Sequence, residues 1–233
     1  MLLKTIGKYL GELLIVVIGI SIAFQLNVWN DNRKSKQLKE DLLHNFKTEN
    51  QSNHKEVNES LTKVQEAIDI DLKLIEMLKN SDTDMDSIRY TIAVLYNISW
   101  PEFTTTHLDN FLNFNEVNSP LREQMLALKT DYSSHALLIN TYKDQKQKKY
   151  FDYLSDAVDM TSNLELVKPE KVMSVQFRNN IMIISAYEQS LEQIYGQISK
   201  SQIKIDSLLA IDLKIPFSLY RDNSLLNNST SAD

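Results

Sequence analysis

The sequence predicts an all-α protein, with one N-terminal transmembrane helix followed by an elongated antiparallel helical bundle or coiled-coil domain. Three observations support this fold class. The 233 residues include only four glycines and four prolines, too few for the many tight turns of β-rich or doubly wound folds. One long uncharged apolar run lies near the N-terminus. Beyond it, apolar residues recur at helical spacing in several long segments.

A transmembrane helix is predicted over residues 9–29, after a short tail at 1–8. The run from Leu13 to Phe24 contains no charge, and the whole segment would be about 31 Å long as a helix, which matches a hydrocarbon core of ~30 Å. A cleaved signal peptide ending at Ser21-Ile22-Ala23 is the main alternative, and a buried soluble helix is another. A retained anchor is favoured because Glu12 interrupts the basic start and the apolar run continues beyond the cleavage site.

The same segment resembles the N-terminal signature of an uncharacterised family of bacterial single-span membrane proteins. The resemblance lies in GELLIVVIGI at 11–20, AFQLNVWN at 23–30 and NRK at 32–34, where members of the family carry GEIVLVVIGI, ALQINNWNE and NRK. It is close over about 25 residues and continues more loosely in the order of helices, including the stretch at 119–122. The resemblance implies a helical inner-membrane protein with no assigned activity.

The expected location is the bacterial inner membrane, with a single pass and the bulk domain in the periplasm. Lys4 and Lys8 precede the span and four basic residues follow it, a count that by itself would leave the large domain in the cytoplasm. That rule weakens for long translocated domains, and many members of the family have a more basic N-terminal tail, which implies a periplasmic domain. This chain lacks most of that tail, so its orientation stays open.

A juxtamembrane helical stalk is predicted at 30–56 and a helical bundle domain at 57–215. No glycine or proline interrupts the chain between Gly19 and Pro101. Residues 47–56 have no apolar side chain and are interpreted as a solvated stalk, with a local break as the alternative. An apolar seam follows at alternating steps of four and three residues, and six of its seven members are apolar: Val57, Leu61, Val64, Ile68, Asp71, Ile75 and Leu78.

Four further helices are expected after this one. Asp86 is the expected N-cap of the first, and Ser119 followed by proline is the start signal of the third. The third presents Leu121, Met125, Leu128, Tyr132, Ile139 and Tyr142 on one face. The expected ranges are about Ser87–Asn97, His107–Phe114, Pro120–Met160 and Met173–Leu213.

The last of these helices has the clearest periodicity in the chain. Eight of its ten seam positions are apolar, in the series Phe177, Ile181, Ile184, Glu188, Leu191, Tyr195, Ile198, Gln202, Ile205 and Leu209. The tail at 216–233 is rich in Asn and Ser, lacks this periodicity and is expected to be disordered. The long helices must bury their stripes against one another, which favours an antiparallel bundle.

No catalytic, cofactor or metal site is predicted. Loops that bind phosphate need several glycines in a short span, and only Gly196 lies beyond the membrane segment. Thiol chemistry is excluded because the chain has no cysteine. None of the four histidines has a histidine partner at helical spacing. The acidic series at 82–86 lacks the glycine and glutamate of a calcium loop and is interpreted as a solvated turn.

A group of lysines flanked by aromatic residues is interpreted as a solvated helix face. A nucleic-acid-binding site normally lies on a domain with a net positive charge. Residues 31–233 instead carry a net charge of about −7, because the total is −6 and the first 30 residues contribute +1 through Lys4, Lys8 and Glu12. The lysines are Lys143, Lys146, Lys148 and Lys149.

Two groups of site residues are predicted at the membrane. One side of the span carries Glu12, Val16, Gly19 and Ala23, and the small Gly19/Ala23 pair would permit a close helix–helix contact. An ionisable residue at the depth of Glu12 is costly, so it either reaches the interface, pairs with Lys8, joins an oligomer contact or serves a proton path. Basic residues directly after the span are expected to contact lipid head groups; these are Arg33, Lys34, Lys36 and Lys39.

The sequence therefore predicts a membrane-anchored helical scaffold, sensor or partner-binding protein, without catalytic activity and without a cofactor. Its expected partners are the lipid bilayer and either a second copy or another protein, and not nucleic acid. The alternative is a subunit of an ion- or proton-coupled membrane complex that uses Glu12. An enzyme with a site assembled across the bundle is a less favoured alternative.

Overall fold

The computed structural model describes residues 2–80, 83–95, 101–114, 119–159 and 165–213, with side chains from Leu14 onward. The described chain is all-α, as predicted. Its three long helices are α1 (Leu2–Lys79), α4 (Pro120–Lys146) and α6 (Val175–Asp212). The shorter ones are α2 (Met85–Leu95), α3 (Thr106–Asn113), the π-helix η1 (Gln147–Asp152) and α5 (Pro169–Val172). The two-residue strands β1 (Val158–Asp159) and β2 (Glu165–Leu166) pair antiparallel.

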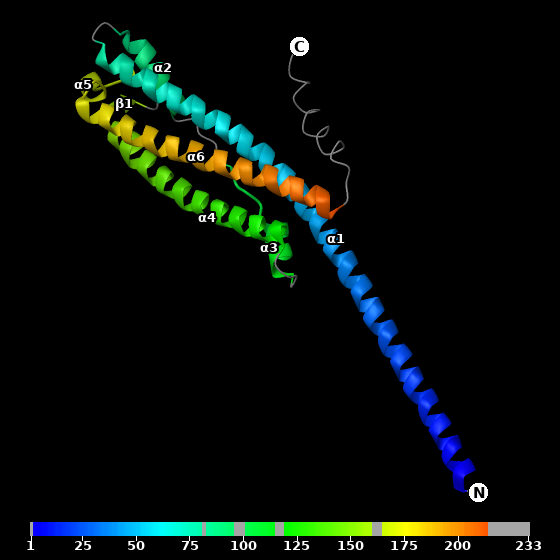
Figure 1. Cartoon of the computed structure of the whole chain (residues 1–233). Helices are drawn as coiled ribbons and strands as arrows, with labels where there is room; N and C mark the ends of the chain where they lie inside the picture. Colours follow the sequence, from blue (N-terminus) through cyan, green and yellow to red (C-terminus); the bar gives the residue numbers. More distant parts are fainter. Residues whose placement is uncertain (1, 81–82, 96–100, 115–118, 160–164, 214–233) are drawn as a thin grey trace.

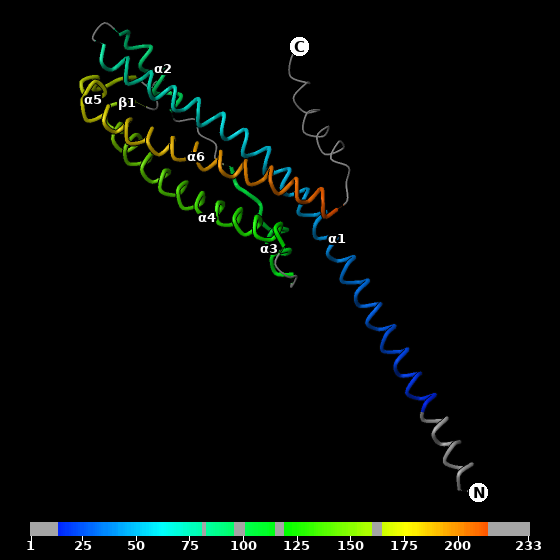
Figure 2. Tube along the Cα trace, in the orientation of Figure 1, coloured from blue at the N-terminus to red at the C-terminus, as the bar shows by residue number. Residues whose placement is uncertain are grey.

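Helix α1 is a rod whose N-terminal part projects from the bundle (Figure 1). The described side chains from Leu14 to Leu38 are exposed, and the first buried one is Leu43. Within the described residues, this is the one helix long and apolar enough to cross a membrane. The C-terminal half of α1 lies beside α6, and α6 lies beside α4 (Figure 2). Helix α6 is therefore the central element of the bundle.

The predicted seams form the core. All ten seam positions of α6 are buried, as are the six face positions of α4. The predicted start of α4 is confirmed, since Ser119 accepts a hydrogen bond from Arg122 N and Pro120 is the first helical residue. Helix α6 is capped in the same way by Ser174, which accepts from Phe177 N. Each cap satisfies a backbone N–H group that has no partner within the helix.

Two expected helix boundaries are wrong. Asp84, rather than Asp86, accepts the hydrogen bond from Ser87 N at the start of α2. The helix expected to reach Met160 ends its α-helical part at Lys146 and continues as η1, followed by a turn and the β1–β2 pair. A π-helix has wider turns than an α-helix, and helical spacing alone did not indicate this change. Residues 81–82 and the tail at 216–233 lie outside the described residues.

The interpretation of residues 47–56 as a solvated stalk is also wrong. Glu49, Asn50 and Asn53 are buried because each finds a polar partner inside the bundle. Glu49 accepts hydrogen bonds from two backbone N–H groups at the start of α3, at 2.8 and 2.9 Å. Asn53 donates to Thr104 O at 2.7 Å, and Asn50 donates to an Asp206 carboxylate oxygen at 2.8 Å. The bundle thus begins well before residue 57.

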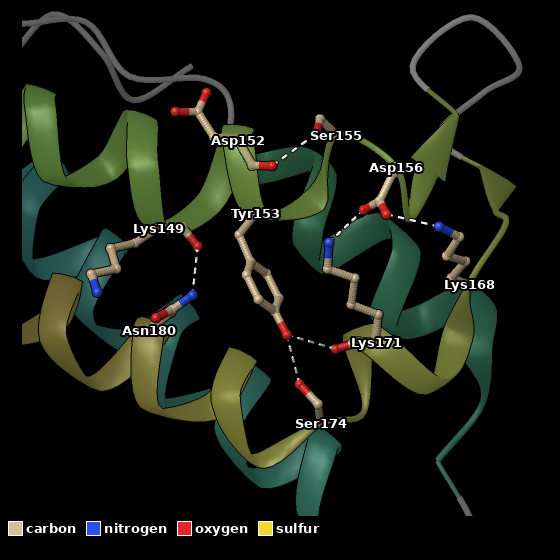
Figure 3. Close-up of polar contacts among 9 residues, drawn as sticks. All are labelled: Lys149, Asp152, Tyr153, Ser155, Asp156, Lys168, Lys171, Ser174 and Asn180. Atoms are coloured by element: carbon tan, nitrogen blue, oxygen red, sulfur yellow. Dashed lines mark hydrogen bonds and ion pairs between the residues drawn. The ribbon is translucent and has the colours of Figure 1, made fainter.

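The far end of the bundle is held by the contacts drawn in Figure 3. Asp156 pairs with Lys171 and with Lys168, the latter at 2.7 Å. The Tyr153 hydroxyl and Ser174 Oγ are 2.9 Å apart, at the start of α6. Asn180 of α6 donates to the Lys149 carbonyl at 3.1 Å, within the π-helix. These contacts fix η1 against α6 and so position the side chains that η1 and the end of α4 direct into the core.

Candidate functional site

The predicted membrane-helix residues lie on the projecting part of α1. Val16, Gly19 and Ala23 are exposed, and a Cβ added at Gly19 would meet no atom within 4 Å. The side chain of Glu12 lies outside the described residues. The structure thus places the predicted association face where a second helix has room to pack.

The predicted lipid-contact residues follow on the same helix. Arg33, Lys34 and Lys36 are exposed, whereas Lys39 is half-buried. The Arg33 guanidinium lies over the Trp29 ring, 5.9 Å from its centroid. These residues lie between the apolar segment and the bundle.

A second candidate site, which the sequence analysis missed, is a cluster of polar side chains at the centre of the bundle. We call it the charged cluster. Its members come from all three long helices and from η1, and none is more than 3% exposed. They are Asp71 of α1, Tyr142 and Lys146 of α4, Tyr150 of η1 and Glu188 of α6.

The cluster is a chain of hydrogen bonds and charge contacts. Tyr150 donates to Asp71 Oδ1 at 2.9 Å, and Tyr142 donates to Glu188 Oε1 at 2.5 Å. Lys146 Nζ donates to the Tyr142 hydroxyl at 3.1 Å and lies 3.8 Å from Glu188 Oε1. The same ammonium faces the rings of Tyr142 and Tyr150, at 5.4 and 5.5 Å from their centroids.

The two carboxyl groups of the cluster influence each other's titration. Asp71 Oδ2 and Glu188 Oε2 are both buried and receive no hydrogen bond from an N–H or O–H donor. Burial and the nearby Glu188 charge raise the pKa of Asp71 to about 8. Asp71 is therefore protonated at neutral pH.

Burial shifts the other ionisable groups of the cluster as well. It lowers the pKa of Lys146, although the charges of Glu188 and Asp71 oppose this shift. It raises the pKa values of Tyr142 and Tyr150 far above their ordinary range, so both phenols stay protonated. Lys146 and Glu188, whose Nζ and Oε1 are 3.8 Å apart, form the ion pair of the cluster.

The prediction that the lysine group is a solvated face is wrong at one residue. Lys143 and Lys148 are exposed, but Lys146 is buried between Tyr142 and Tyr150. Tyr142, Lys146 and Tyr150 follow one another at intervals of four residues. In an α-helix of ~3.6 residues per turn, this spacing rotates each successive side chain away from the previous one. The wider turns of η1 reduce that rotation and keep the three side chains on one face. Lys146 enters the core because the cluster supplies a carboxylate, a hydroxyl and two aromatic rings around its ammonium.

A signal for the cluster was present in the sequence. Asp71 and Glu188 are polar members of otherwise apolar seams, and a polar residue on a buried face normally has a partner. Gln202, the other polar member of the α6 seam, is likewise buried and donates to the Tyr132 hydroxyl at 2.9 Å. The polar exceptions in the periodicity thus mark the polar contacts of the core.

A cavity of about 120 Å³ lies beside the cluster. Its walls include Val64, Ala67 and Ile70 of α1 and Leu95 of α2, and Tyr142, Lys146, Glu188 and Tyr195 also line it. The cavity therefore brings apolar surface from α1 and α2 together with polar side chains of the charged cluster.

One histidine is also part of this region of the core. His135 of α4 is buried, and its Nε2 lies 3.1 Å from the Tyr195 hydroxyl. Burial lowers the pKa of His135 to about 4, so the imidazole is neutral at pH 7. Among the described residues, no three His, Asp or Glu side chains gather closely enough to hold a metal ion.

Comparison with known proteins adds no relative. No family model, curated protein or solved structure matches this chain.

Proposed function

We propose that this protein is a membrane-anchored helical sensor without catalytic activity, in which the charged cluster is the sensing element. The observation that carries the proposal is the continuity of α1. One unbroken helix holds both the exposed apolar segment that ends near Trp29 and, 42 residues later, Asp71 of the cluster. At a rise of ~1.5 Å per residue, a single element links the cluster to the membrane over about 63 Å.

The energetics of the cluster favour a sensor over a purely structural core. A buried ion pair contributes little net stability, and apolar residues of similar volume often replace one without loss. The structural alternative is that the cluster fixes the register of α1, α4 and α6. A cluster that contains a buried carboxyl group with a pKa of about 8 also has discrete protonation states near neutral pH. Packed helices respond to such changes by small shifts rather than by continuous deformation.

The contacts of the ionisable groups support a non-catalytic role. Both phenols stay protonated, and each donates to a carboxyl group of the cluster. Lys146 faces Glu188 and two aromatic rings. The alternative role of Glu12 in an ion- or proton-coupled complex stays a prediction, and the variant Glu12→Gln tests it: a sensor keeps its response in this variant, whereas a coupled complex loses transport.

The sensing role is tested by measuring whether α1 moves when the cluster changes its charge. The chain has no cysteine, so spin labels can be attached at Lys36→Cys on the projecting part of α1 and at Lys204→Cys on α6, both exposed positions. Full-length protein in lipid nanodiscs is compared at pH 6 and pH 9, on either side of the Asp71 pKa of about 8. We expect the distance between the labels to change by about 1–2 Å.

Two variants make this test specific. Asp71→Asn cannot ionise and should abolish the pH response, whereas Asp69→Asn, at an exposed position on the same helix, should keep it. If the folded wild-type protein shows the same distance at both pH values, the sensing role is wrong.

A further inference from the structure

The cavity beside the charged cluster contains unused hydrogen-bonding capacity. An ammonium group has three N–H donors, and the Lys146 ammonium makes one hydrogen bond, to the Tyr142 hydroxyl. Glu188 Oε1 lies 3.8 Å from Nζ, which is beyond hydrogen-bond distance. The side chain is only 3% exposed and lines the cavity, so an acceptor oxygen within the cavity would complete its coordination.

The charge balance of the cluster selects a neutral occupant. With Asp71 protonated, the cluster holds one positive and one negative charge in the core. An anionic head group would face the Glu188 carboxylate, and a cationic one would face the Lys146 ammonium, each adding an uncompensated buried charge. A carbonyl or hydroxyl oxygen accepts from Lys146 without changing the net charge.

The volume and the lining of the cavity determine the size of the ligand and the polarity of the part that does not contact Lys146. A protein cavity of ~150 Å³ holds a molecule with the six heavy atoms of benzene, and this cavity measures about 120 Å³. Lys63 and Glu66, which also line the cavity, are exposed residues, whereas Val64, Ala67, Ile70 and Leu95 present apolar surface to it. That surface favours an apolar body over a chain of water molecules.

We infer that this cavity binds a small neutral molecule of up to about six heavy atoms, with a carbonyl or hydroxyl oxygen at Lys146 and an apolar body against α1 and α2. The inference rests on the proposed sensing role and names the chemical class of its ligand. Such a ligand would contact both the charged cluster and α1. Its binding would therefore affect the protonation of the cluster and the position of α1.

The probes are butyramide, butyrate and butylammonium, which share a four-carbon chain and differ in the charge of the head group. Each is titrated against full-length protein in lipid nanodiscs, and binding is followed by saturation-transfer NMR of the probe. We expect butyramide to bind at least about tenfold more tightly than the two charged probes. Equal binding of butyrate, or no binding of butyramide, overturns the inference, and a cavity filled only by water gives the second result.

Two pairs of variants locate the binding. Ala67→Leu fills the cavity and should abolish butyramide binding, while Ala136→Leu, the same change at an exposed position of α4, should not. Lys146→Met should weaken binding at least about tenfold, and Lys148→Met, at an exposed position, should leave it unchanged. If Lys146→Met does not fold, the alanine pair decides, and binding that survives Ala67→Leu places the probe elsewhere and overturns the inference.

The spin-label distance between positions 36 and 204 separates this inference from the sensing role. If butyramide binds but the distance responds neither to binding nor to pH, the ligand class is supported and the sensing role is wrong. If the distance responds to pH but butyramide does not bind, the sensing role is supported and the ligand class is wrong.

Discussion

Asp71 shows how a single ionisable residue can occupy a position that the helix periodicity assigns to an apolar one. Two demands act on it, because Tyr150 donates a hydrogen bond to it while burial and the nearby Glu188 carboxyl group disfavour its charged form. A protonated carboxyl group meets both demands, and so does the carboxamide of asparagine. Asp71 therefore acts as a neutral hydrogen-bonding group in the folded protein.

The variant Asp71→Asn should make stability less dependent on pH. In the unfolded chain the Asp71 carboxyl loses its proton near pH 3.8, and in the folded protein near pH 8. Between these values the folded state binds the extra proton, so this group lowers the free energy of unfolding as pH rises, by at most about 1.4 kcal/mol per pH unit. Asparagine removes that loss, and the variant should match the wild type near pH 4 and exceed it at pH 8.

Denaturant unfolding at pH 4, 6 and 8 measures this difference. Glu188 and Lys146 are present in both proteins, so their own titrations cancel to first order in the comparison. Asp69→Asn is the matched control at an exposed position. A stability difference between Asp71→Asn and wild type that stays constant across this range would show that Asp71 is not protonated in the folded state.

At the scale of the helix, periodicity predicted buried faces well, because burial of a helix depends mainly on which side chains share one side of it. The α6 seam is buried at every predicted position, including Glu188 and Gln202. The same reasoning failed for residues 47–56, because Glu49 and Asn53 are buried by hydrogen bonds to the backbone of α3 and its preceding loop. Apolar periodicity contains no information about such partners.

The charged cluster could be predicted only in part for a related reason. Spacing along one helix marks Asp71 and Glu188 as exceptions, but it does not show that they lie at the same level of the bundle. That level is set by how α1, α4 and α6 pack and by the switch from α-helix to π-helix after Lys146. Lys146 itself has the sequence context of a surface residue, among lysines and glutamines, and only its partners on α1 and α6 explain its burial.

The α6 seam can be tested by placing a charge within it. Ile184 is fully buried, whereas its neighbour Ile183 is 40% exposed. Ile184→Asp should reduce the free energy of unfolding by about 3–5 kcal/mol, because it leaves an unpaired carboxylate in the core. Ile183→Asp should cost about 1 kcal/mol or less. Denaturant unfolding followed by circular dichroism measures both, and equal losses would mean that the packed face of α6 is wrongly assigned.

At the scale of the whole molecule, an exposed stretch of α1 separates the apolar segment from the bundle. From Trp29 to Leu43, the first buried residue, α1 advances about 21 Å. The apolar side chains from Leu14 to Val28 are exposed on every side of the helix, far more than a soluble monomer normally exposes in one patch. A bilayer around this segment would remove that surface from water and would leave the bundle clear of the head groups.

The full chain should therefore fractionate with membranes, resist carbonate extraction and migrate without cleavage. The fragment 31–215, which lacks the apolar segment, should be soluble and strongly helical by circular dichroism. N-terminal sequencing of the mature full-length protein distinguishes the anchor from a signal peptide, because a cleaved chain would begin at Phe24. A full-length protein released by carbonate would contradict the transmembrane prediction.

Association through the predicted span is testable because, within the part of the chain that the structure describes, the side chains from Leu14 to Leu38 are all exposed. A Cβ at Gly19 would meet no atom within 4 Å, so Gly19→Ile causes no clash within the monomer. In a dimer that packs through Gly19 and Ala23, the larger side chain would hold the two backbones apart and lose their close contact. We expect Gly19→Ile to reduce association of the full-length protein at least about fivefold in a membrane two-hybrid assay. Ile18→Leu, on a different side of the span, should associate like the parent, and equal association of all three proteins would mean that the span serves only as an anchor.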